Sequence, residues 1–198
     1  MESNSNFFVD NTHEINGTIA RSLAICSIVP IALMVCNWMG IFNFNSDLKV
    51  TICGVGFWVT LSPVVLYKFK INDNILKYYM LIMLSLFICL LGRNNGIGIY
   101  ITYVLVPIVS CLYFDTLFTV KIALLSYVTM AIGVYYNCAG KLEVQFKNWS
   151  HMLTFRNYMI GFTMEFVVVM LFLYQVVKRS EKIIKGQIES VSTLREEN

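Results

Sequence analysis

Charged side chains are scarce in this chain. Of its 198 residues, 14% are charged and 57% are hydrophobic, whereas soluble domains carry about 25% charged and about 45–50% apolar residues. This composition excludes an ordinary water-soluble catalytic domain. The few charges are also unevenly distributed, because residues 178–198 hold nine of them while residues 15–177 hold only fifteen. The sequence therefore predicts a hydrophobic body followed by a short charged tail.

The motifs of catalysis and metal binding are missing as well. The sequence has no G-x-S-x-G, no phosphate-binding glycine loop, no H-E-x-x-H and no acidic metal pair. Its two histidines, His13 and His151, lie far apart, and five of its six cysteines fall inside apolar runs, where cysteine behaves as a small hydrophobe. The net charge of +3 forms no basic stripe. We therefore expect no enzymatic activity of this chain, no catalytic residue, no metal, no cofactor and no nucleic-acid partner.

Long apolar runs are what the sequence does contain. They are continuous, not alternating, which favours membrane-spanning helices over a transmembrane barrel. A body of this length has room for six spans of about 20 residues. The fold class predicted is an all-α polytopic membrane protein with six transmembrane helices and a cytoplasmic C-terminal helix. The predicted spans are 22–42, 50–67, 75–91, 97–114, 117–136 and 158–177.

Three segments follow from this pattern: a polar N-terminal segment (1–17), a six-helix transmembrane module (18–177) and a connector helix (178–198). All three prolines, Pro30, Pro63 and Pro107, lie inside predicted spans. Proline removes a backbone donor, so neighbouring helices must supply a new partner for the carbonyl that it leaves free. The prolines are expected to bend these helices.

The distribution of lysine and arginine predicts the orientation in the cell membrane. With the N-terminus inside, the cytoplasmic segments hold ten of these residues and the outer segments hold five. Because cytoplasmic loops of membrane proteins are enriched in Lys and Arg, both termini are predicted to be cytoplasmic.

The charged tail has the pattern of a helix. Apolar residues spaced by seven, four and three positions share one face, namely Val177, Ile184, Ile188 and Val191. With Val177, Ile184 and Val191 at heptad positions a, the d positions hold Ser180, Gln187 and Leu194. The β-branched a residues favour a parallel homodimer, and the polar d residues weaken it. Alternatively, the basic residues lie against anionic headgroups. The tail ends without a C-cap residue, which suggests an output helix that continues further.

Glu165 is the one carboxylate predicted to lie deep in the membrane. It stands about eight residues into the last span, where a charged side chain costs about 2.5–3.5 kcal/mol. It is therefore a candidate site for a ligand cation or for a protonation switch. The alternative is a protonated carboxyl that is hydrogen-bonded to a neighbouring helix.

A second candidate site lies on the predicted outer face. Polar and aromatic residues of two connections face the same side there: Arg93, Asn94, Asn95, Trp149, His151 and Arg156. Such a mouth can receive a small acidic or aromatic ligand. Trp149 can instead belong to an interfacial aromatic belt.

Three stretches resemble a known kind of module. They are IVPIALMVCNWMGIF (28–42), LSPVVLYK (61–68) and YVLVPIVSCLYFD (103–115). They resemble the six-span N-terminal modules of clostridial-type bacterial signalling receptors. Such modules precede GGDEF diguanylate cyclase domains, and similar ones precede histidine kinase or methyl-accepting domains. None of these output sequences is present here, so the resemblance implies a sensor and connector and carries over no catalytic or ligand residue.

The sequence thus predicts a sensory and dimerisation module in the lipid bilayer. A ligand or membrane signal would pass through the sixth helix to a cytoplasmic output domain, which the resemblance implies to be a diguanylate cyclase. The alternative is the small six-span substrate-binding subunit of a vitamin or metabolite transporter. The charged helical tail and the scarcity of alanine argue against that alternative, since tight helix contacts in membranes use small residues.

Overall fold

The computed structural model describes residues 2–41, 51–92, 101–144 and 150–196. These residues are almost entirely helical and contain no strand, which confirms the all-α prediction. The helices are α1 (Glu2–Cys26), α2 (Ile28–Trp38), η1 (Thr51–Val55), α4 (Gly56–Lys68), α5 (Asp73–Gly92), η2 (Ile101–Val104), α6 (Leu105–Ser110), η3 (Cys111–Tyr113), α7 (Thr116–Val144) and α8 (His151–Glu196).

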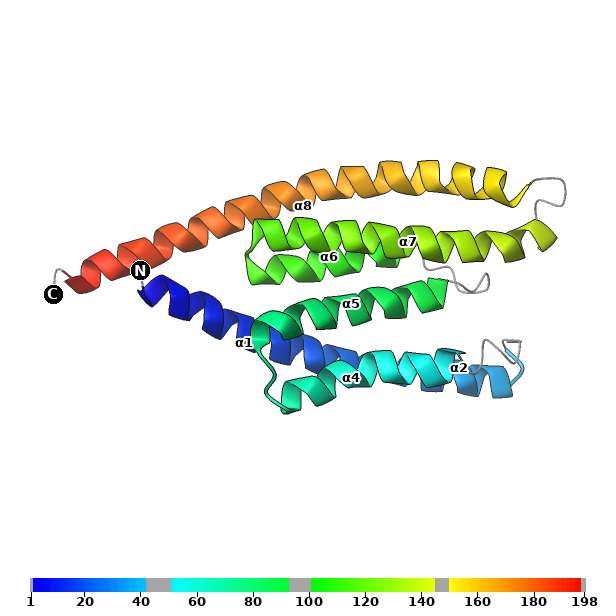
Figure 1. The fold of residues 1–198 in the computed structure, drawn as a ribbon, viewed down its shortest axis with the longest axis horizontal. Coiled ribbons are helices and arrows are strands. Elements are labelled where there is room, and N and C mark those ends of the chain that lie inside the picture. The colour runs from blue at the N-terminus through cyan, green and yellow to red at the C-terminus, as the bar shows by residue number, and fades with distance from the viewer. Residues whose placement is uncertain (1, 42–50, 93–100, 145–149, 197–198) are drawn as a thin grey trace.

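The helices form an elongated bundle (Figure 1). The α1–α2 pair, α4, α5, α6, α7 and α8 run along it in alternating directions, and both termini lie at the same end. Helix α5 packs against α1, α4, α6 and α7, so it occupies the centre of the bundle. Helix α8 packs chiefly against α7 and runs antiparallel to it. Toward the C-terminus it continues past the residues at which α7 begins.

Four helices are long and apolar enough to cross a membrane: Asn11–Trp38, Asp73–Gly92, Thr116–Ala139 and His151–Val191. The predicted spans 50–67 and 97–114 coincide with shorter helical pieces, α4 and the apolar stretch Thr102–Tyr113. The chain is thus a helical protein with the composition of a membrane protein. Six complete spans are more than the described residues establish.

One helix break lies close to a proline. The first long helix is interrupted at Ser27, between α1 and α2. Pro30 lacks the N–H that would bond to the carbonyl of Cys26, and its ring crowds that carbonyl. Ser27 closes the turn with a hydroxyl bond of 2.6 Å to the carbonyl of Ala24. The helix is therefore interrupted close to this proline, whereas α4 continues through Pro63 without a break.

A neighbouring helix compensates for Pro107. This proline, in α6, leaves the carbonyl of Tyr103 without its usual intrahelical donor. The buried hydroxyl of Ser126, on α7, donates to that carbonyl at 2.7 Å. The replacement donor therefore comes from α7, which also fixes the position of α6 on the bundle.

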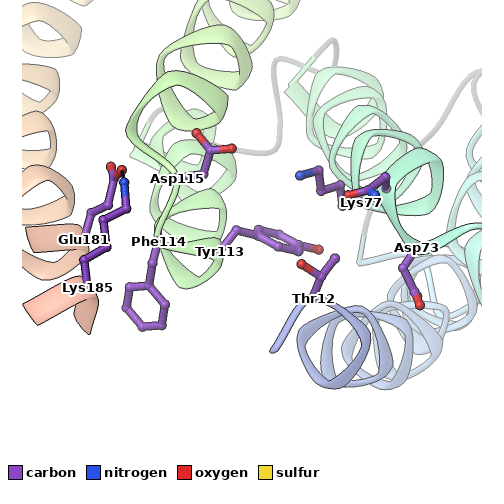
Figure 2. A pocket seen from close by; sticks show the side chains of 9 residues that line it. Thr12, Asp73, Lys77, Tyr113, Phe114, Asp115, Glu181 and Lys185 are labelled. Atoms are coloured by element: carbon purple, nitrogen blue, oxygen red, sulfur yellow. Dashed lines mark hydrogen bonds and ion pairs between the residues drawn. The ribbon is translucent and has the colours of Figure 1, made fainter. Parts of the chain in front are cut away.

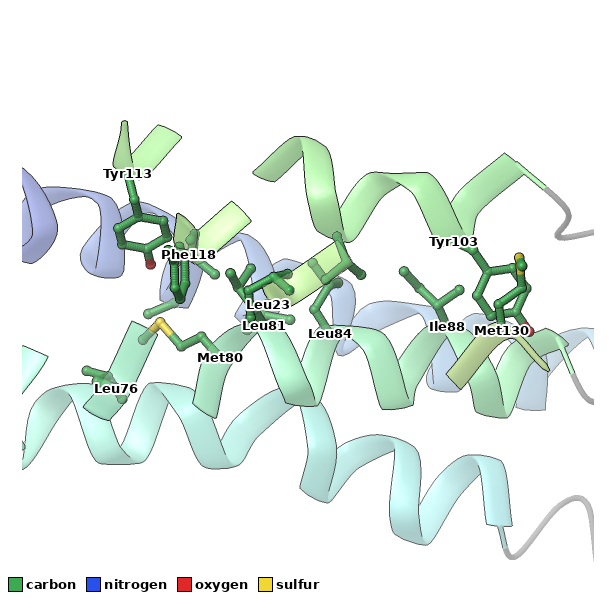
Figure 3. Close-up of a cluster of buried hydrophobic side chains, with 14 of the residues drawn as sticks. Leu23, Leu76, Met80, Leu81, Leu84, Ile88, Tyr103, Tyr113, Phe118 and Met130 are labelled. Carbon is green, nitrogen blue, oxygen red and sulfur yellow. The ribbon is translucent and has the colours of Figure 1, made fainter. Parts of the chain in front are cut away.

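The core lies between α1, α5 and α7 (Figure 3). Leu23, Met80, Leu81 and Phe118 are all at most 2% exposed. A few small polar groups sit among these apolar side chains, and the hydroxyls of Ser85 and Thr129 lie 2.5 Å apart between α5 and α7. Because each of these hydroxyls has a partner inside the protein, the core contains polar groups without a desolvation penalty for unpaired ones.

The Ser126–Tyr103 bond can be tested by substitution. Ser126→Ala leaves a buried carbonyl without a donor, so the free energy of unfolding in detergent should fall by about 1–3 kcal/mol. Pro107→Ala restores a backbone N–H that can bond to the same carbonyl. In the Pro107→Ala background, Ser126→Ala should therefore cost clearly less. An equal loss in both backgrounds would show that the serine acts in some other way.

Candidate functional site

A polar pocket opens at the end of the bundle where both termini lie (Figure 2). Its volume is about 420 Å³. Residues from α1, α5, the turn before α7 and α8 line it, namely Thr12, Asp73, Asn74, Lys77, Tyr113, Phe114, Asp115, Glu181 and Lys185. Three carboxylates and two lysines thus meet in a chain that has few charges. This pocket, called the polar pocket below, is the candidate functional site.

The turn before α7 places Asp115 on one wall of the pocket. Phe114 has a φ of 51°, in the left-handed region, which reverses the chain direction between η3 and α7. Asp115 then caps α7, because its Oδ1 accepts a hydrogen bond of 2.9 Å from the backbone N–H of Phe118. Aspartate is a preferred residue at this position, since its carboxylate satisfies an otherwise unpaired donor.

Glu181 ties α8 to the beginning of α7. Its Oε2 accepts hydrogen bonds from the backbone N–H of Thr116 at 3.1 Å and from the Thr116 hydroxyl at 2.5 Å. Its Oε1 forms an ion pair of 2.6 Å with Lys185, one turn further along α8. The carboxylate also lies at the positive end of the α7 dipole. We call these contacts of Glu181 the α7–α8 clamp.

The clamp determines the pKa of Glu181. Partial burial alone would raise this pKa, but the hydrogen bonds from Lys185 and Thr116 and the charge of Lys185 lower it below the ordinary value of 4.5. A lowered carboxyl pKa means that the ionised form stabilises the folded arrangement. This stabilisation is present above the pKa of the unfolded chain and is lost as the pH falls through the lower pKa of the folded chain.

A buried asparagine connects the residues of the opposite wall of the pocket. Asn16, on α1, is fully buried and its Nδ2 donates to both the carboxylate and the backbone carbonyl of Asp73, at 2.9 and 3.1 Å. Its Oδ1 accepts a hydrogen bond of 2.7 Å from the hydroxyl of Tyr113. The ring of His13 adds a contact of 3.0 Å between Nδ1 and Asp73 Oδ2. These bonds hold α1, α5 and η3 together around the pocket.

Lys77 points from α5 into the pocket (Figure 2). Its ammonium lies 4.8 Å from the ring centroid of Phe118 and 5.7 and 6.0 Å from those of Tyr78 and Tyr113. In the described part of the chain, no carboxylate lies within ion-pair distance of it. Aromatic faces attract a cation, so these contacts favour the position of the Lys77 side chain inside the pocket.

The candidate residues predicted from sequence lie elsewhere. Glu165 is on α8 with an exposed side chain, at the edge of a small cavity that it shares with Tyr103 and Phe162. Arg156 is exposed beside an apolar groove on α8. His151 lies against α7, with Nε2 3.0 Å from the carbonyl of Tyr135 and its ring 4.5 Å from the Tyr135 ring.

The predicted outer-face cluster cannot be assembled from these positions. Arg93, Asn94, Asn95 and Trp149 lie outside the described residues. His151 and Arg156 belong to the first turns of α8. Their role in a ligand site on the outer face stays a prediction.

The predicted tail residues occupy different environments along α8. Val177 is 1% exposed and packs within its own chain, whereas Val191 is 52% exposed. Ile184 and Ile188 are half-buried. A second copy of the chain could therefore not contact Val177 in this arrangement, although the continuous helix predicted through the tail is present.

Sequence reasoning missed the polar pocket, although a signal was available. The predicted topology puts the connections 68–74 and 115–116 and the tail at one end of the molecule. Their charged residues could have been grouped on that basis. The Asn16 side chain could not have been added, because nothing in the sequence distinguishes it from the other polar residues of the N-terminal segment.

Comparisons with protein-family models, curated proteins and solved structures found no match to this chain. The resemblance to clostridial-type signalling modules therefore stays a prediction. In the described part of the chain, no group of three or more His, Cys, Asp or Glu side chains is placed to hold a metal ion.

The clamp gives a testable pH dependence. Above pH 5, Glu181→Ala should increase amide hydrogen exchange in residues 181–194 of α8, because the helix loses its bonds to Thr116 and Lys185. In the unmodified chain, the same increase should occur only as the pH falls below the ordinary Glu value of 4.5. Glu189→Ala, which removes a carboxylate two turns further along α8, serves as the control. Equal exchange in the two variants would refute the role of the clamp.

Proposed function

We propose that this chain is the membrane-embedded sensory and connecting module of a bacterial signalling receptor. The observation that carries the proposal is α8, which runs without interruption from His151 to Glu196. One part of it packs on α7 inside the bundle, and the rest continues past the bundle as a charged helix. A single rigid element thus joins the apolar body to the region beyond it.

The clamp gives this element a defined point of control. Glu181 bonds to the beginning of α7, and Thr116 follows directly on the turn that carries Asp115. A change in the polar pocket would therefore act on α8 at the point where it leaves the bundle. A stimulus can shift such a system only if it favours one of two packings over the other. The clamped arrangement is one such packing, and a released α8 is the other.

The remaining parts of the proposal follow from the predicted topology and the resemblance. According to this proposal, six segments of the bundle lie in the cell membrane and both termini are cytoplasmic. The output is a diguanylate cyclase domain that follows the connector helix, and the module acts as a homodimer. Its stimulus is a small ligand or a state of the membrane.

Insertions in the connector test whether α8 transmits a signal. A cyclase domain is fused after Asn198, and one, two, three or four alanines are inserted between Val177 and Lys178. Each residue turns a helix by about 100°, so cyclase activity should vary with the inserted length and recover near four residues. The measurement is the rate of product formation in membranes.

The control is the same set of alanines placed after the last residue of the fused cyclase domain, where they leave the register between α8 and that domain unchanged. Activity that ignores the position and length of the insertions would contradict the proposal. If a vitamin or metabolite also co-purified with the chain, the transporter alternative would be favoured instead.

A further inference from the structure

Among the four described helices that are long and apolar enough to cross a membrane, α8 is the least covered by the rest of the chain. Only 11% of its most apolar 18-residue window is buried, against 50% for α5 and for α7. Much of the uncovered surface of α8 is apolar and suits lipid, including Leu171 and Phe172, which are 64% and 72% exposed. Two positions do not suit lipid, because the polar side chains of Glu165 and Gln175 are exposed on the same helix.

In the predicted span, Glu165 lies at a depth where lipid offers its carboxylate no hydrogen-bond partner. It follows the start of the predicted span at Tyr158 by about 10 Å and precedes the end at Val177 by about 18 Å along the helix axis. Among the described residues it has no hydrogen-bond or ion-pair partner. Hydrocarbon offers neither donors nor acceptors, and carboxylates within spans almost always face protein or water. Glu165 borders a small cavity that it shares with Tyr103 and Phe162, but its exposed carboxylate has no polar partner there, so a second protein surface can supply one.

The neighbours of Glu165 form a seam for a second helix. Exposed residues alternate at spacings of four and three along the same side of α8: Gly161, Glu165, Val168, Phe172, Gln175 and Arg179. This spacing is that of the contact positions in a two-stranded coiled coil. Gly161, one turn before Glu165, has open space where a Cβ would stand. A glycine on an open helix face allows the backbone of a second helix to approach closely.

We propose that this seam is a homodimer interface in which two Glu165 side chains meet across a two-fold axis. In a two-fold contact, each copy presents the same patch to the other, so residues near the axis face their own counterparts. A protonated carboxyl of one copy can then donate to the carboxyl of the other, which satisfies both groups without help from lipid. An unrelated partner would need a separate complementary group, whereas a second copy provides one by symmetry.

This seam differs from the one predicted from the tail. Val177 stands twelve residues after Glu165, which places it about 120° around the helix. It is buried within its own chain, while the residues of the seam are exposed. The inference extends the homodimeric part of the proposed function. It is tested without an output domain, so either proposal can fail while the other stands.

The test is the monomer–dimer equilibrium of the purified full chain in liposomes, followed by single-molecule photobleaching over a range of protein-to-lipid ratios. Glu165→Leu removes the interhelical hydrogen bond, which should raise the dissociation constant by about three- to thirtyfold. Glu165→Gln keeps a group that both donates and accepts, so it should dimerise nearly as well as the unmodified chain. Gly161→Leu should give monomers because it blocks close approach.

Val167→Phe is the matched control. Val167 is exposed on the same helix at 50%, but it lies about 200° around the helix from Glu165. This substitution should leave the dissociation constant unchanged. A photo-crosslinking residue in place of Phe172 should yield covalent dimers, and one in place of Val167 should not, which tests the seam without altering Glu165.

Three results would overturn the inference. The first is that the unmodified chain stays monomeric at the highest protein density. This result overturns the inference also if the chain binds a different protein in cells. The second is a dimer that Glu165→Leu weakens no more than Val167→Phe does. The third is equal crosslinking from positions 167 and 172.

Discussion

The structure depends on one constraint: apolar surroundings supply no hydrogen bonds, so polar groups among these helices must find partners inside the protein. Helix formation satisfies most of the backbone, and the exceptions occur at the prolines. At Pro107 the freed carbonyl of Tyr103 is bonded by Ser126 from the next helix. The same constraint explains why Asn16 uses its amide to bond both Asp73 and Tyr113. These bonds determine which helices lie next to one another. Apolar contacts between similar side chains specify the neighbours of a helix less strictly.

Some polar side-chain atoms do not meet the constraint within the described residues, among them the buried Nδ2 of Asn11. Asn137 donates to the carbonyl of Gly92 at 2.7 Å, but its buried Oδ1 has no partner there. Glu165 has no partner either, and its exposed side chain borders a small cavity. The two positions differ in one respect, because Asn137 lies beside Gly92, at the edge of the described residues, whereas Glu165 lies in the middle of a well-described helix. Glu165 is therefore the unpaired side chain on which the proposed dimer interface rests.

The sequence was informative wherever a local pattern decides the structure. Continuous apolar runs predicted the helices, and Pro30 marked the break between α1 and α2. It was less informative where spans had to be counted, because α4 and the apolar stretch Thr102–Tyr113 are shorter than the four helices that are long enough to cross a membrane. It could not show the polar pocket, since Asp73, Asp115 and Glu181 come from three distant segments. It also could not show which side of α8 faces the bundle, because valine and isoleucine occur on both sides of that helix.

The two faces of α8 give its position in the bundle a mechanical meaning. Glu181 stands sixteen residues after Glu165, which places it about 160° around the helix, nearly opposite the seam. One side of the helix thus bonds to α7 at the polar pocket, while the other side carries the carboxyl that needs a partner. A rotation of α8 cannot alter one contact and preserve the other, because the helix has no proline between the two residues at which it could bend independently. Occupation of the polar pocket and pairing of two chains would therefore be coupled through the rigidity of α8, without any further contact between the two sites.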